Sequence, residues 1–183
     1  MTDPRANGAL IAKEREALEN LVGPDTVSRA LGKLPNDVRE AYESITPLTR
    51  IPTDYVEQVY YMVADEAGRD ALELHREVVR VGVEGALRTI WRVLLRFTSD
   101  AAIVRRTPLF FSRGLSQGTL TSQMLNPGHA EIRLEGWPDV SAMQINGITA
   151  ATQTVLECAG RNGVELDYDR TLDGCRIVAR WRV

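Results

Sequence analysis

The sequence is poor in the residues that mark metal and redox sites. Its 183 residues include two histidines and two cysteines: His75, His129, Cys158 and Cys175. No histidine lies three or four residues from the other histidine or from a cysteine, which is the spacing typical of a zinc site. In a reducing compartment, an isolated pair of cysteines is best interpreted as two free thiols. The sequence therefore predicts no bound metal and two small, partly buried thiols.

Long hydrophobic runs and a strong net charge are also missing. A helix needs about 20 consecutive apolar residues to span a membrane, and no run approaches that length. No basic-then-apolar stretch at the start resembles a signal peptide. The net charge is -3, from 22 basic and 25 acidic residues, so no global field favours nucleic acid. We expect a cytoplasmic protein that does not insert into membranes and does not bind nucleic acid.

Catalytic motifs are absent as well. Ser112, Ser116 and Ser122 lack the Gly-x-Ser-x-Gly context of a hydrolase nucleophile. The carboxylates of Asp167 and Asp169 are two residues apart on a predicted strand, which places both on one face, commonly the solvent-exposed one. A general acid needs burial or a charged neighbour to raise its pKa. The sequence therefore predicts a protein that is not an enzyme.

What the chain does contain is a clear pattern of hairpin, helix and hairpin in its last 66 residues. Segments rich in β-branched and apolar residues form two pairs: 119–125 with 129–137, and 164–168 with 175–183. The first pair flanks Asn126-Pro127-Gly128 and the second flanks Leu172-Asp173-Gly174, which are turn sequences. Between the pairs, Ser141 to Gly160 has helical spacing and ends on a glycine that can terminate a helix. This part predicts a four-stranded antiparallel sheet made of two hairpins separated by a long helix.

The sequence before this sheet is mainly helical. Apolar residues at three- and four-residue spacing predict helices over 10–22, 25–31, 35–44, 54–67, 70–98 and 100–112. Residues 1–7 are expected to fray, and residues 45–52 to form a linker, because prolines 47 and 52 disfavour helix. The fold class is thus α+β, with N-terminal helices packed on the sheet. We divide the chain into a helical extension, 1–22, and a single ligand-binding-like domain, 23–183.

The predicted helix over 70–98 has one regular polar stripe. It consists of residues four apart: Arg76, Arg80, Glu84, Arg88, Arg92 and Arg96. Two interpretations stay open, a solvated face with internal ion pairs, or a strip that faces an anion or an acidic partner. Under the second interpretation, the candidate anion or partner surface comprises Arg88, Arg92, Arg105 and Arg106.

Several short motifs carry a family resemblance that spans Leu34 to Trp181. They are Arg105-Arg106-Thr107-Pro108-Leu109-Phe110-Phe111, Asn146-Gly147-Ile148, Cys158-Ala159-Gly160, Thr171-Leu172-Asp173-Gly174 and Arg180-Trp181. In layout this stretch resembles an uncharacterised myxobacterial paralogous family related to the heme-NO-binding, 4-vinyl reductase and TRAPP-like ligand-binding superfamily. The resemblance implies helices packed on one face of a four-stranded sheet, with an apolar cavity between the layers. The heme-binding branch relies on a proximal histidine and a Tyr-x-Ser-x-Arg motif. This motif is absent here, so no cofactor is expected.

The resemblance and the missing catalytic motifs together favour a non-enzymatic regulatory or sensory domain that binds a small apolar or anionic ligand. The candidate ligand-binding residues lie on the long helix and in the C-terminal half: Leu87, Ile90, Trp91, Leu94, Trp137 and Met143. The same residues also suit an ordinary core. The alternative is a protein-protein interaction module, such as a homodimer, without a small-molecule ligand. A pocket between sheet and helices would favour the first hypothesis, and a closed core the second.

Overall fold

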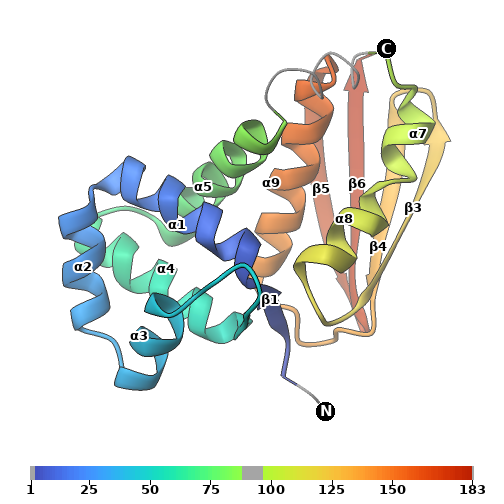
Figure 1. The fold of residues 1–183 in the computed structure, drawn as a ribbon. Helices are drawn as coiled ribbons and strands as arrows, with labels where there is room; N and C mark the ends of the chain where they lie inside the picture. Colours follow the sequence, from blue (N-terminus) through green and yellow to red (C-terminus); the bar gives the residue numbers. More distant parts are fainter. Residues whose placement is uncertain (1–2, 88–96, 183) are drawn as a thin grey trace. The chain divides into compact units, whose positions relative to one another are not determined.

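The computed structural model describes residues 3–87 and 97–182 (Figure 1). These residues form two compact units, each of which is described by itself. The first comprises Met1–Gly82 with Gly114–Ser116, and the second Val83–Arg113 with Gln117–Val183. The predicted boundary at residue 22 stays a prediction.

The first unit is a helical layer with one short two-stranded sheet. Its elements in chain order are β1 (Arg5–Asn7), α1 (Gly8–Val22), α2 (Pro24–Gly32), α3 (Asn36–Glu43), β2 (Arg50–Pro52), α4 (Thr53–Ala67) and α5 (Ala71–Ala86), which belongs to this unit up to Gly82. Local capping sets several of these limits. The Asn7 side chain accepts a hydrogen bond from the Ala9 N–H at the start of α1. Gly68, in the left-handed conformation, ends α4, and the Asp70 carboxylate accepts from two backbone N–H groups at the start of α5.

The small sheet corrects two expectations. Residues 1–7 were expected to fray and 45–52 to form a linker, yet β1 and β2 pair antiparallel, with Ala6 opposite Ile51. Both of these side chains are buried. A three-residue strand is too short to show an alternating pattern, and its partner lies more than 40 residues away. Sequence periodicity therefore could not reveal this pairing.

The second unit contains the predicted four-stranded antiparallel sheet and confirms the α+β fold class. Its elements are α7 (Asp100–Val104), α8 (Thr107–Gly114), β3 (Thr119–Asn126), β4 (His129–Glu135), α9 (Ala142–Cys158), β5 (Asn162–Thr171) and β6 (Gly174–Arg182). The strand order is β3-β4-β6-β5. Ile132 and Ile177 face each other at the centre of the sheet. Both are fully buried, and α9 lies against one face of this sheet in Figure 1.

Two predicted helices differ from the structure. The long helix was expected over 70–98, whereas α5 is Ala71–Ala86, and residues 88–96 lie outside the described part of the chain. The helix expected over 100–112 is two helices, α7 and α8. Pro108 explains this break, since proline has no N–H to continue a helix and disfavours helical geometry in the residue before it. The break places α8 as a separate helix beside β3.

A polar network holds the start of α7 against the C-terminal strands of the same unit. Arg161 donates to the Asp100 carboxylate, with Nε to Oδ1 at 2.7 Å, and to the backbone oxygens of Thr98 and Ala159. The indole N–H of Trp181 donates to the other Asp100 oxygen at 3.0 Å. The side chains of Arg161 and Asp100 are only 14% and 25% exposed. This network therefore acts in a partly desolvated place, where charged hydrogen bonds are strong.

We predict that replacing Arg161 with methionine lowers the free energy of unfolding by about 2 kcal/mol, because Asp100 loses its ion pair while staying partly buried. Chemical denaturation measures the change. The control Arg182→Met removes an exposed arginine from β6 and should change stability by less than about 0.5 kcal/mol. Equal stability of the Arg161 variant and wild type would contradict a structural role for the network.

Candidate functional site

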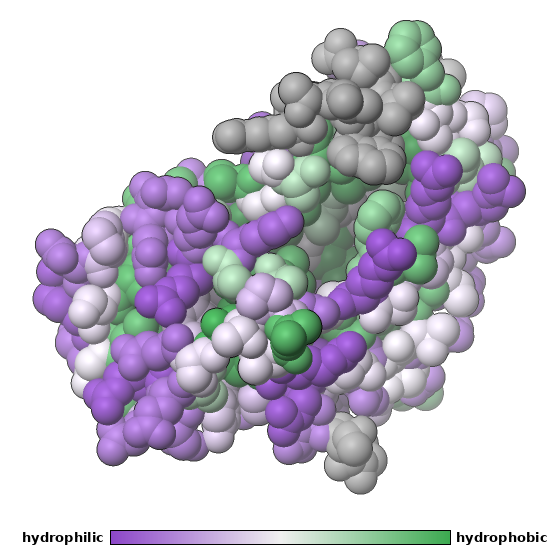
Figure 2. All heavy atoms as spheres, in the orientation of Figure 1, coloured by the Kyte–Doolittle hydropathy of each residue, from purple (hydrophilic) through white to green (hydrophobic). Residues whose placement is uncertain are grey.

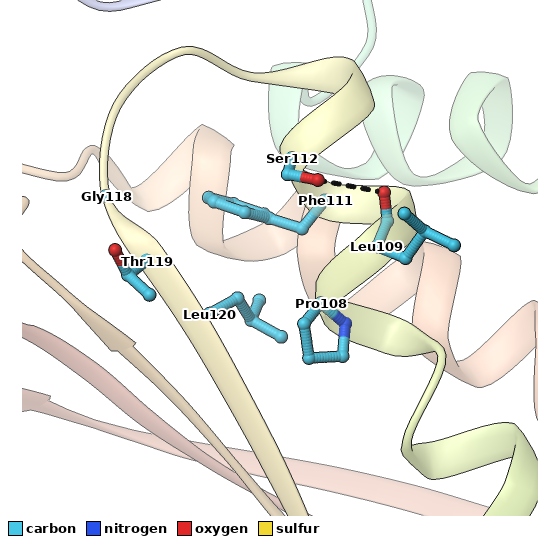
Figure 3. Close-up of a pocket in the computed structure, with 7 residues that line it drawn as sticks. All are labelled: Pro108, Leu109, Phe111, Ser112, Gly118, Thr119 and Leu120. Carbon is cyan, nitrogen blue, oxygen red and sulfur yellow. Dashed lines mark hydrogen bonds between the residues drawn. The ribbon is translucent and has the colours of Figure 1, made fainter.

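The candidate site is an open apolar groove between α8 and β3, inside the second unit. It has a volume of about 310 Å³, and Figure 3 shows its lining: Pro108, Leu109, Phe111, Ser112, Gly118, Thr119 and Leu120. The Phe111 ring and the Leu120 side chain lie between the helix and the strand. Ligand sites of small molecules are mostly apolar hollows with a few polar groups, and their volumes start at about 300 Å³. The groove is therefore large enough for a small or slender ligand.

Local sequence explains why this groove is open. Helix α8 consists largely of apolar residues, yet the structure gives it no buried residue. Leu109 and Phe110 are 50% and 58% exposed. On the facing strand, Leu120 is buried, and Gly118 has a φ of +79°. A methyl group on Gly118 would come within 2.7 Å of the Leu134 side chain, so the chain needs glycine where it enters β3.

Polar atoms in the groove are few. The Ser112 hydroxyl donates to the Leu109 carbonyl oxygen at 3.1 Å, so its own lone pairs remain as acceptors. The Thr119 hydroxyl is the other side-chain polar group of the lining. Neither side chain is titratable near neutral pH, and neither has a histidine or carboxylate partner in the described hydrogen bonds. The groove is therefore suited to binding and has no acid, base or activated nucleophile.

Arginines lie at both ends of the helix that forms the groove. Arg105 and Arg106 directly precede α8, and Arg113 lies in its last turn. All three are exposed. Within the described part of the chain, none of them makes an ion pair. Figure 2 shows hydrophilic and hydrophobic side chains next to one another over α7 and α8.

The first unit contains a separate cluster of buried titratable side chains. The Tyr60 hydroxyl donates to Glu14 Oε2 at 3.2 Å, and the rings of Tyr60 and His75 meet edge to face with centroids 4.6 Å apart. All three side chains are at most 7% exposed. Burial raises the pKa of Glu14 from 4.5 to about 7, although the hydrogen bond from Tyr60 opposes this rise. Burial also lowers the pKa of His75 from 6.5 to about 4, so its ring is neutral at pH 7.

Both histidines have a ring nitrogen that is buried without a hydrogen-bond partner among the described residues. These atoms are Nδ1 of His75 and Nε2 of His129. Unpaired buried nitrogens are uncommon, because they lose their hydrogen bonds to water without replacement. A neutral imidazole with a free nitrogen is also the usual nitrogen ligand of a metal or heme iron.

The structure places the residues predicted from sequence as follows. Trp137 and Met143 are buried in the second unit, at 5% and 1% exposure, and neither lines the groove. Leu87 is half-buried. Predictions that lie outside the described residues are Ile90, Trp91, Leu94, Arg88 and Arg92. Arg105 and Arg106 are exposed, as expected of an anion or partner surface. The ligand-binding role of all these residues stays a prediction.

The residues that line the groove were not among those predicted from sequence. A signal was present, since Pro108 to Phe111 is an apolar run between the pair Arg105-Arg106 and the single Arg113. Because the sequence predicts one continuous helix over 100–112, it does not predict the break that makes α8 a separate helix beside β3.

Three other findings concern the classes of site that were considered from the sequence. Cys158 and Cys175 are both buried, whereas the sequence predicted partly buried thiols, and they form no disulfide. No cluster of metal-binding side chains occurs among the described residues. No described helix combines the length and the apolar character needed to cross a membrane.

Comparisons with known proteins show the fold. No protein-family model matches the chain, and no curated protein matches it in sequence. Among solved structures, the unliganded Fe(II) H-NOX protein from K. algicida is similar with a TM-score of 0.72 at 8% identity, over 97% of each chain. An H-NOX mutant from T. Tengcongensis has a TM-score of 0.69 at 14% identity, covering 97% of this chain and 98% of its own. An oxygen-binding H-NOX domain related to soluble guanylate cyclases has a TM-score of 0.67 at 13% identity, with coverages of 97% and 95%. The chain therefore has the H-NOX fold.

This result corrects one expectation and supports another. The lack of a Tyr-x-Ser-x-Arg motif led to the prediction of no cofactor. That prediction is contradicted, because structures with this fold are heme proteins, one of them described through the redox potential of its distorted heme. The predicted likeness to the heme-NO-binding superfamily is confirmed at the level of fold, while the myxobacterial family is not confirmed.

Proposed function

We propose that this chain is a non-enzymatic sensory domain whose signal is a small molecule bound in the groove between α8 and β3. The observation that carries the proposal is the apolar groove of about 310 Å³ within a fold shared with H-NOX sensor domains. The lining supports binding over catalysis, since it contains two hydroxyl groups and no titratable side chain. Cytoplasmic location and dimer formation are further parts of this proposal.

Heme is the first ligand to test, because the structural neighbours include heme proteins. None of the seven residues that line the groove can coordinate iron, so the groove by itself does not fit a heme. A heme would need an axial ligand elsewhere in the chain. Our candidate for this ligand is His75 in the first unit, since its ring is neutral at pH 7 and its Nδ1 has no partner among the described residues. Heme bound in this way would supply an iron atom for a diatomic gas such as oxygen.

The experiment is a titration of the purified full chain with hemin, followed by absorbance. We expect a Soret band that saturates at one heme per chain. His75→Ala should abolish the saturable band, and the matched variant His129→Ala should keep it, because only His75 is assigned as the axial ligand. Circular dichroism checks that both variants stay folded.

Three results would contradict parts of the proposal. Loss of the band in His129→Ala alone would assign the other histidine. Absence of any saturable Soret band would exclude heme as a ligand of this chain, while leaving a ligand of the groove for test. Absence of binding by hemin and by uncharged apolar probes such as decanol would contradict the sensory-domain proposal itself.

A further inference from the structure

The distribution of charge around the groove is unusual for this chain. No acidic residue occurs between Asp100 and Glu131, and the interval contains Arg105, Arg106 and Arg113. The whole chain has a net charge of -3, whereas this interval has a charge of +3, which is opposite in sign. The uncompensated positive charge thus falls on the segment that builds α8 and β3.

The acidic residues that border this segment make no ion pair with its arginines among the described residues. The Asp100 carboxylate is already bound by Arg161 and Trp181. Glu135 is opposite Thr119 in the sheet, so its side chain is on the same face as Thr119 and on the other face from Leu120. Asp173 accepts a hydrogen bond from the Gly136 N–H. The three arginines therefore remain exposed and without an ion pair among the described residues.

Guanidinium groups bind carboxylates through two parallel hydrogen bonds, and such bonds are strongest beside an apolar surface that excludes water. Arg106 is two residues from Pro108, and Arg113 is next to Ser112, so both are close along the chain to residues that line the groove. Apolar lining and flanking guanidinium groups together match a molecule with an apolar body and one acidic end.

We propose that the groove between α8 and β3 selects an apolar monocarboxylate, such as a medium-chain fatty acid, with Arg105, Arg106 and Arg113 as the cations that hold its carboxylate. This inference rests on the proposed function, since it names the ligand class of the same groove. It adds a requirement for negative charge that an apolar groove alone does not impose. The slender shape of an acyl chain also suits an open groove of about 310 Å³.

The experiment compares decanoate with decanol by isothermal titration calorimetry, both below their aggregation concentrations and at low salt. The two probes share the apolar chain and differ in charge. We expect decanoate to bind about ten-fold more tightly than decanol, which is the typical contribution of a hydrogen bond to a charged group. The triple variant Arg105→Gln/Arg106→Gln/Arg113→Gln should remove this preference and leave decanol binding unchanged.

A matched triple variant distinguishes an effect of the three arginines near the groove from an effect of the net charge of the chain. Lys13→Gln/Arg50→Gln/Arg182→Gln makes the same change in net charge at exposed positions outside the groove, and should keep the preference for decanoate. The Ser112→Trp variant fills the groove from an exposed position on α8, and should lower the affinity for both decanoate and decanol.

The outcomes distinguish this inference from the proposed function. Equal affinity for decanoate and decanol in the wild type would overturn the role of the arginines while supporting an apolar site. Equal loss of preference in both triple variants would overturn it too, because a global charge effect would then explain the result. Unchanged decanoate binding in Ser112→Trp would place the site elsewhere. If neither probe binds and hemin does not bind, both the inference and the proposed function fail.

Discussion

Replacement of Gly174 by alanine is expected to lower the free energy of unfolding by about 4 kcal/mol or more. Gly174 begins β6 directly after the Asp173 turn. A methyl group built on it would be 2.1 Å from the Leu134 backbone oxygen and 2.9 Å from the Leu134 carbonyl carbon. Both are backbone atoms of a central strand, so removing the clash with the methyl group requires movement of β4 or β6 and loss of hydrogen bonds between these strands. A fall in melting temperature of roughly 10 °C is the expected readout.

The control for this variant is Gly82→Ala. Gly82 lies inside α5, and a methyl group there would meet no atom within 4 Å. Alanine loses less backbone entropy than glycine in a helix, so this change should stabilise the chain by about 0.5–1 kcal/mol. A melting temperature of Gly174→Ala equal to that of wild type would show that the close approach of β6 to β4 is not rigid.

Stability of the chain is expected to depend on pH through two buried groups with opposite signs. The folded-state pKa of Glu14 is raised from 4.5 to about 7, so its contribution to stability is fully present below pH 4.5 and is lost as pH rises to 7. The folded-state pKa of His75 is lowered from 6.5 to about 4, so its contribution is present above pH 6.5 and is lost as pH falls to 4. Each effect amounts to about 3 kcal/mol. In the wild type they largely cancel between pH 4.5 and 6.5.

Single substitutions should expose each effect. In Glu14→Gln, which keeps an acceptor for the Tyr60 hydroxyl, the free energy of unfolding should fall by about 3 kcal/mol relative to wild type as pH decreases from 7 to 4.5. In His75→Phe, which keeps an aromatic edge against Tyr60, it should fall by about 3 kcal/mol relative to wild type as pH increases from 4 to 6.5. Urea denaturation across this range measures both slopes. Variant and wild-type curves that run parallel would show that neither group titrates in this window.

The sheet could be predicted from sequence because its signals are local. Asn126-Pro127-Gly128 and Asp173-Gly174 are turn sequences that fix two hairpins, and the helix between them begins with a Ser141 side chain that accepts from the Gln144 N–H. The confirmed strand limits differ by only a few residues from the predicted ones, the largest change being that β5 extends over Asn162–Thr171. Each of these features depends on residues within one turn or one hairpin.

The groove could not be predicted in the same way. Its lining comes from α8 and from the start of β3, and its shape depends on the helix break at Pro108. No local sequence pattern predicts the direction that α8 takes after this break. The buried cluster was missed for a related reason. Glu14 and Tyr60 are 46 residues apart, and nothing in their own segments distinguishes a buried glutamate from an exposed one.

The amino-acid sequence by itself determined the fold class, the two hairpins, the long helix between them and the basic character of the α8 segment, because each follows from neighbouring residues or from composition. Tertiary structure alone decided the pairing of β1 with β2, the opening of the groove, and the pKa shifts of Glu14 and His75. These depend on which distant side chains exclude water from a given atom. Burial is a property of packing, and packing is set by residues that sequence order keeps apart.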